Sequence, residues 1–122
     1  MATRYEAAAR STDVFGRVLC STREHHFVID GPVANGCPGE EVTPAEAFLA
    51  GIAACSVELI HVFAREDGLP LRSVRAGIEG DLDRDNPIRK DVTVFNRVAL
   101  LLELEGVDAS QGAKLVERFK GR

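Results

Sequence analysis

Cys55 is the residue whose type and setting are best suited to chemistry. The thiolate is the nucleophilic form of cysteine, and nearby positive charge favours it at neutral pH. Glu58 lies three residues later, which is about one helical turn along the same side. The alternative is structural, because free cysteine is among the most buried residue types and packs as a small apolar side chain. The residues around Cys55 leave both interpretations open.

The stretch that must position Cys55 is a helix predicted from Thr43 to Asp67. Thr43 can cap its N-terminus, Pro44 suits the first helical position, and Glu46 can reach back as the acid of a capping box. Gly68 follows the last helical residue, where a left-handed conformation commonly ends a helix. The predicted helix has about 24 residues and a length of roughly 36 Å.

The residues of this predicted helix are apolar on nearly every side. Between Ala47 and Phe63, only Ser56, Glu58 and His61 are clearly polar. A helix that is apolar all round is typically buried, so we expect the thiol to be buried as well. We also expect a second copy of the chain to cover part of the helix. A thiol in the middle of a helix gains nothing from the N-terminal dipole, so its positive charge must come from another element.

The remaining elements predict an α+β domain of order βββ-α-ββ-α, with the helices on one face of an antiparallel sheet. Alternating apolar residues and turn residues place these elements. The predicted strands are Tyr5–Arg10, Val14–Cys20, His26–Ile29, Leu71–Asp83 and Val92–Glu105, with a loop from Gly31 to Val42 and a second helix capped by Asp108 and Gln111. A chain of 122 residues is expected to form a single domain, residues 1–122.

Composition narrows the partners and the compartment. A net charge of −4 with no block of like charges does not favour nucleic acid or an anionic membrane. The longest apolar stretch, Ala47 to Ser56, is too short to span a bilayer, and no signal peptide is visible. Three cysteines without a C-x-x-C motif favour a reducing compartment, so we expect a soluble cytoplasmic protein.

Two clusters have the composition of metal sites without the spacing. Structural-zinc spacing is missing among the candidate ligands Cys20, His25, His26, Asp30 and Cys37. The repeat Asp81-x-Asp83-x-Asp85 resembles the start of a calcium loop but lacks its glycine and its bidentate glutamate. We therefore expect no metal and no other cofactor.

The run from Thr43 to Cys55 resembles the helix that carries the peroxidatic cysteine in the OsmC/Ohr family, the osmotically induced and organic-hydroperoxide-resistance proteins. His26–Pro32 and Asp91–Asn96 resemble strands of the same family, and the likeness extends from about Val14 to Phe119. It is closest to the broad OsmC-like branch. The resemblance implies an intertwined homodimer and a thiol-dependent hydroperoxide reductase, in which Cys55 attacks a small or fatty hydroperoxide.

The resemblance also implies partners for the thiol. In the family's hydroperoxide reductases an arginine from the N-terminal strands lies over the thiolate, and Arg17 and Arg23 are both candidates for that position. Glu58 can meet such an arginine or can form a buried ion pair with Arg65 or a strand arginine instead. His61 projects away from Cys55 and is expected in the core or at an interface.

The family's resolving cysteine stands in a Cys-Pro motif on the second helix or just after it. The sequence reads Lys120-Gly121-Arg122 at that point and apparently lacks this segment. Either the chain is cut short there or it has no internal disulfide step, and in the second case an external thiol would be the reductant. Two hypotheses follow. The first is the hydroperoxide reductase, and the second is a non-catalytic OsmC-like dimer that binds a small apolar ligand at the dimer interface, with Cys55 merely packed.

Overall fold

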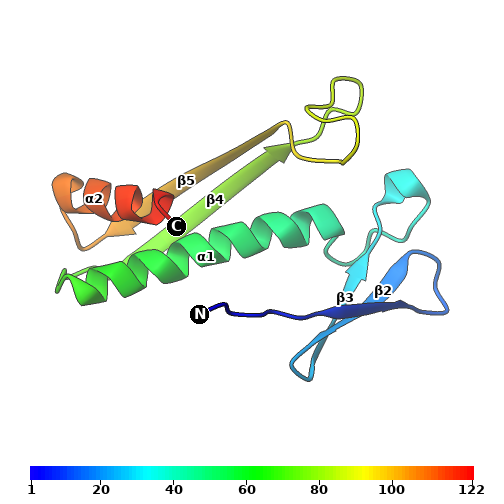
Figure 1. Ribbon diagram of the computed structural model, residues 1–122, viewed down its shortest axis with the longest axis horizontal. Coiled ribbons are helices and arrows are strands. Elements are labelled where there is room, and N and C mark those ends of the chain that lie inside the picture. Colours follow the sequence, from blue (N-terminus) through cyan, green and yellow to red (C-terminus); the bar gives the residue numbers. More distant parts are fainter. The chain divides into compact units, whose positions relative to one another are not determined.

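The computed structural model describes all residues, 1–122, and has the predicted element order βββ-α-ββ-α (Figure 1). The elements are β1 (Ala8–Ser11), β2 (Arg17–Thr22), β3 (His25–Asp30), a short 3₁₀ turn η1 (Val33–Asn35), α1 (Pro44–Glu66), β4 (Ser73–Asp81), β5 (Arg97–Glu105) and α2 (Ala109–Lys120). The strands form two antiparallel sheets, β1-β2-β3 and β4-β5. The chain divides into two compact units, Met1–Phe48 and Leu49–Arg122, which we describe one at a time.

In the first unit, β2 begins three residues later than the sequence predicts. Residues 12–16 form a turn rather than the start of the strand, because the Thr12 hydroxyl donates a hydrogen bond to the Arg17 carbonyl oxygen at 3.0 Å. Gly16 completes this turn with a φ of +82°. The connection between β2 and β3 is a two-residue turn made by Arg23 and Glu24, since Thr22 pairs directly with His25.

The start of α1 confirms the predicted capping box. The Thr43 backbone N–H and hydroxyl donate to Glu46 Oε1 at 2.9 and 2.8 Å, and the Glu46 N–H donates back to Thr43 Oγ1 at 3.4 Å. The helix ends before Gly68, whose φ is +65°, and the Leu69 N–H closes the end by donating to the Ala64 carbonyl oxygen at 2.9 Å. A glycine tolerates this left-handed conformation without a Cβ clash.

The second unit packs α1 and α2 around one small core. β4 and β5 each have nine residues and run side by side as a hairpin (Figure 1). The fully buried apolar side chains are Ile60, Phe63 and Ala64 of α1 and Leu115 of α2. Half-buried apolar residues pack against them, namely Leu59, Val62, Leu69, Leu71, Val74, Leu102, Leu104 and Phe119. The predicted cap of α2 is confirmed, because the Gln111 N–H donates to Asp108 Oδ1 and the Asp108 N–H donates to Gln111 Oε1.

The long strand predicted from Val92 is wrong in its first five residues. β5 begins at Arg97, and residues 82–96 form a loop. The Asn96 side chain fixes this loop, since its Oδ1 accepts from the Asp83 N–H and its Nδ2 donates to the Asn86 carbonyl oxygen, both at 2.7 Å. β-Branched residues at 92–94 favour a strand locally, but these hydrogen bonds hold the backbone away from β4.

The prediction that α1 is buried on every side is wrong for the single chain. Only four of its residues are buried: Ser56, Ile60, Phe63 and Ala64. The complete helix is also long and apolar enough to cross a membrane by length and composition alone, because an 18-residue window within it has a mean hydropathy of 1.9. The shorter stretch Ala47 to Ser56 therefore underestimated the apolar length of the helix. Core helices of soluble proteins meet the same two criteria. The apolar residues of α1 therefore extend beyond the stripe that its own chain covers.

Candidate functional site

Cys55 lies on α1 in the second unit, and its side chain is exposed. This corrects the prediction of a buried thiol, because the chain covers only the opposite stripe of α1. Cys55 lines a cavity of about 450 Å³ together with two α1 side chains and the end of α2. Its other lining residues are Ile52, Leu59, Phe119, Lys120 and Arg122. An exposed thiol beside a partly apolar cavity can meet a small molecule, which a packed thiol cannot.

Glu58 and His61 are exposed on α1 and line a different cavity, of about 500 Å³, together with Arg65. Glu58 forms no ion pair within the chain, so the alternative of a buried pair with Arg65 or a strand arginine is wrong. His61 is exposed, so it does not lie in the core of the single chain, and its expected place at an interface stays a prediction. Glu58, His61 and Arg65 therefore follow a stripe of α1 that the chain leaves open to solvent.

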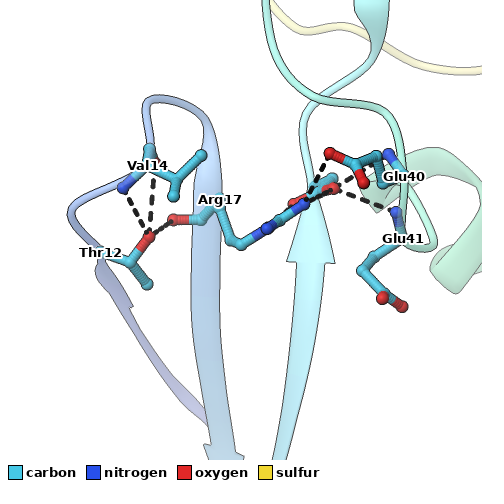
Figure 2. Close-up of polar contacts among 6 residues, drawn as sticks. Thr12, Val14, Arg17, Glu40 and Glu41 are labelled. Atoms are coloured by element: carbon cyan, nitrogen blue, oxygen red, sulfur yellow. Dashed lines mark hydrogen bonds and ion pairs between the residues drawn. The ribbon is translucent and has the colours of Figure 1, made fainter.

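Arg17 lies in the first unit, at the first residue of β2, directly opposite Asp30 at the last residue of β3. Its Nε donates to Asp30 Oδ1 at 2.8 Å and its Nη2 donates to Asp30 Oδ2 at 2.9 Å, which is a bidentate ion pair. The same Nη2 lies 3.5 Å from Glu40 Oε1. Dashed lines mark the contacts of this cluster in Figure 2. The guanidinium is thus held in place from two sides.

Asp30 is the acceptor on which this cluster depends. Its side chain is fully buried, and its Oδ2 also accepts the backbone N–H groups of Glu40 and Glu41, both at 3.0 Å (Figure 2). The hydrogen bonds from Arg17 hold the pKa of Asp30 well below its ordinary value, against the opposing effect of burial. The Asp30 carboxylate in turn raises the pKa of Arg17. Asp30 therefore remains ionised and anchors the loop that leads into α1.

Arg23 lies at the other end of β2 from Arg17, in the exposed turn before β3. Its φ is +47° and that of Glu24 is +72°, which L-residues adopt at a cost. The two candidate arginines thus differ in kind, since Arg17 is anchored and Arg23 stands at an exposed tip. Both arginines belong to the first unit. Cys55 and Glu58, which lie one helical turn apart on α1, belong to the second unit.

Sequence reasoning missed Asp30 as the partner of Arg17. A usable signal was present in the β2–β3 hairpin. Placing a two-residue turn at Arg23 and Glu24 pairs residue 17 with residue 30 by counting outward from the turn. A carboxylate opposite an arginine across two strands is a stabilising pair.

The other two cysteines are half-buried in the first unit, and all three thiols are free. Cys37 Sγ occupies the space that a Cβ on Gly16 or on Gly31 would need, so the thiol fits only because both residues are glycines. No three side chains among histidine, cysteine, aspartate and glutamate come together in a group that could hold a metal ion.

The fold and the exposed helical thiol define a class of small α+β proteins with a cysteine on the central helix. The chain belongs to the OsmC-like protein family, whose family model matches residues 37–121. No curated protein matches the chain.

Several solved structures share the fold. The OsmC-like protein from Mycoplasma pneumoniae is 15% identical with a TM-score of 0.83, over 100% of this chain and 84% of that one. An organic hydroperoxide resistance protein OsmC from Legionella pneumophila is 22% identical with a TM-score of 0.75, over 99% and 85% of the two chains. An organic hydroperoxide resistance protein from Elizabethkingia anophelis, with thiocyanate bound, is 16% identical with a TM-score of 0.71, over 99% and 84%. At these identities the likeness establishes the fold.

Proposed function

We propose that this OsmC-like protein is a thiol-dependent reductase of organic hydroperoxides that uses Cys55. The observation that carries the proposal is the exposure of the Cys55 thiol beside its cavity of about 450 Å³. Free cysteines are usually buried and inert, so an open thiol on an otherwise apolar helix suits a reactive role. Proteins with the same fold are described as organic hydroperoxide resistance proteins, which supports this choice of substrate.

The chemistry follows from the thiolate. The Cys55 sulfur attacks the terminal oxygen of R–O–O–H, an S–O bond forms, and the O–O bond breaks. The sulfur is oxidised to a sulfenic acid, the peroxide is reduced by two electrons, and the alkoxide takes up a proton to leave as the alcohol. One external thiol then displaces water to give a mixed disulfide, and a second thiol releases the Cys55 thiol. This cycle suits a reducing, cytoplasmic compartment.

Positive charge for the thiolate is proposed to come from an arginine of the N-terminal strands. Arg17 suits this role better than Arg23, because Asp30 fixes its orientation while its Nη1 makes no hydrogen bond within the chain. Glu58, one turn from Cys55 on α1, is proposed to orient that guanidinium.

A homodimer is part of the proposal. The exposed residues of α1 include Phe48, which is 60% exposed, and an exposed aromatic side chain on a long apolar helix suits an interaction site. A second copy of the chain can cover α1 symmetrically, because a two-fold interface brings the same surface of each protomer together.

One observation favours the alternative of a non-catalytic binding protein. Arg17 is engaged by Asp30 and approached by Glu40, so two carboxylates offset one guanidinium charge. In that case the cavity beside Cys55, with its apolar residues Ile52 and Leu59, would hold a small apolar molecule without reaction.

Mass spectrometry separates the two functions. After one equivalent of an organic hydroperoxide, we expect one added oxygen on the Cys55 peptide, and none in Cys55→Ser. Cys20→Ser and Cys37→Ser serve as matched controls and should retain the reaction. If Cys55 remains a thiol in the folded protein, or if the oxygen appears on Cys20 or Cys37, the reductase proposal fails and the binding protein remains. A disulfide from Cys55 to either cysteine would show that the resolving thiol is internal.

A further inference from the structure

The loop of residues 82–96 joins β4 to β5 (Figure 1) and lines a cavity of about 340 Å³ that the proposed reaction does not use. This cavity shares no lining residue with the one that contains Cys55. Its polar lining residues are three cations, two carboxylates and a hydroxyl, namely Arg84, Arg89, Lys90, Asp83, Asp91 and Thr93. Cations outnumber carboxylates here, so an anion is the kind of ligand that suits this cavity.

The loop itself uses both carboxylates of the cavity. Asp83 Oδ1 accepts a backbone N–H and Asp83 Oδ2 accepts the Asn86 side-chain amide, both at 3.0 Å. The two oxygens of Asp91 accept Arg89 Nε at 3.1 Å and Arg89 Nη2 at 2.6 Å, which is a bidentate pair. Asp91 therefore neutralises Arg89, and Asp83 holds the backbone of the loop.

The other two cations of the cavity have no such partner. Arg84 and Lys90 form no ion pair within the chain. Both side chains are exposed, and both line the cavity. The Thr93 hydroxyl lines it as well and can donate a hydrogen bond. The loop thus brings two unpaired cations and a hydroxyl donor to one cavity.

Contacts with β4 hold this loop in place. The Asn96 N–H donates to the Asp81 carbonyl oxygen at 2.8 Å, and the Asn96 side chain bonds to the backbone of residues 83 and 86. The Phe95 ring occupies the space that a Cβ on Gly80 would need, so it lies directly against β4. A loop held in this way presents its cations with less loss of conformational freedom when a ligand binds.

We propose that this loop binds a small phosphate ester through Arg84, Lys90 and Thr93. A phosphate group carries nearly two negative charges at neutral pH and has three acceptor oxygens, which matches two cations and a hydroxyl. The planar guanidinium can donate two parallel hydrogen bonds to phosphate oxygens. The exposed apolar side chains of Leu82 and Val92 also line the cavity and suit the organic group of the ester.

Binding at this site does not require a reactive Cys55, so its test is independent of the proposed reductase. Exposed charge pairs are weak, so we expect affinities in the millimolar range. Loss of one cation should weaken binding by about fivefold, because the phosphate carries nearly two charges. Loss of both cations should abolish measurable binding.

Titration with phenyl phosphate, followed by NMR of the isotope-labelled protein at constant ionic strength, measures the affinity and locates the site. The largest amide shifts should fall within residues 82–96. Binding should weaken by about fivefold in Arg84→Gln and in Lys90→Gln, and should be retained in Lys90→Arg. The matched control is Arg75→Gln, which removes an exposed, unpaired cation of β4 that does not line the cavity and should leave binding unchanged.

A variant without any change of charge tests whether the loop is a built site. Asn96→Ala removes both side-chain hydrogen bonds of the loop and should weaken binding, while circular dichroism and alkylation of Cys55 by iodoacetamide should remain as in the wild type. Unchanged binding in Asn96→Ala would show that exposed charges alone attract the anion, and would overturn the proposal. So would shifts spread over cations elsewhere in the chain, or an equal loss of affinity in Arg75→Gln.

Two further ligands separate the parts of the ester. Inorganic phosphate lacks the ring and should bind about five- to tenfold more weakly than phenyl phosphate, because it buries no apolar surface. Equal affinities would overturn the assignment to an ester in favour of the free anion. Benzoate keeps the ring but has a single charge, and should bind more weakly than phenyl phosphate. If benzoate binds as tightly, the site recognises a carboxylate and the phosphate assignment fails.

Discussion

Replacing Arg23-Glu24 by Asn-Gly should stabilise the protein and leave Cys55 reactive. Both residues have positive φ in the two-residue turn between β2 and β3, and Asn-Gly is the preferred pair for such turns. A left-handed conformation costs an L-residue about 1–2 kcal/mol, and asparagine and glycine adopt it more readily. The glycine lowers the free energy of unfolding by about 0.5–1 kcal/mol, because it increases the conformational freedom of the unfolded chain.

The net gain for the double variant is therefore about 1 kcal/mol in the free energy of unfolding. For a chain of 122 residues this raises Tm by about 4 °C. The assay is thermal unfolding followed by circular dichroism, with wild type and variant at the same protein concentration. Arg23→Lys is the matched control, since it keeps the charge and the strained backbone and should leave Tm unchanged.

The same variants decide between the two candidate arginines. If Arg17 is the functional residue, oxidation of Cys55 by an organic hydroperoxide proceeds at the wild-type rate in the Asn-Gly variant. A lower Tm would refute the backbone-strain argument. A higher Tm combined with lost reactivity would instead assign the functional role to Arg23.

Three further predictions concern the helix start, the buried carboxylate and the assembly. Thr43→Ala should lower the free energy of unfolding by about 1 kcal/mol, because the helix loses its cap. Glu46→Gln keeps the acceptor oxygen and should change stability little. A large loss of peroxide reactivity in a stable Glu46→Gln protein would contradict the capping role. Asp30 has a lowered pKa in the folded protein, so its stabilisation is present above the unfolded pKa of about 3.9 and is lost as the pH falls towards the folded value. Below about pH 4, Asp30→Asn should therefore lose less stability on acid titration than the wild type does. Identical acid titration curves for the two proteins would argue against this cluster. If a second copy covers α1, Tm should rise with protein concentration and sedimentation should give a dimer, whereas a monomer at micromolar concentration with a constant Tm would exclude it.

Local signals in the sequence were sufficient for the helices. The Thr43/Glu46 and Asp108/Gln111 capping boxes each form between residues three apart, so their hydrogen bonds depend on the local backbone alone. The left-handed Gly68 is local in the same way. The element order and the α+β class follow from such signals, together with the alternation of apolar residues along β4.

Strand limits depended on contacts that local propensity does not contain. The β-branched residues at 92–94 suggested a strand, but the Asn96 side chain binds Asp83 and Asn86 and keeps that segment in a loop. The start of β2 moved for a similar reason, because the Thr12 hydroxyl bonds to the carbonyl oxygen of a residue five positions away.

The sequence by itself determined that the chain carries a cysteine at the middle of a long apolar helix, because helix caps and apolar spacing are properties of neighbouring residues. It also supplied both candidate arginines. Only the tertiary structure decided that Cys55 is open to a cavity and that Arg17 is clamped by a buried Asp30. Burial and ion pairing depend on which segments far apart in the chain pack against each other. A helix that is apolar all round does not reveal which of its sides its own chain will cover.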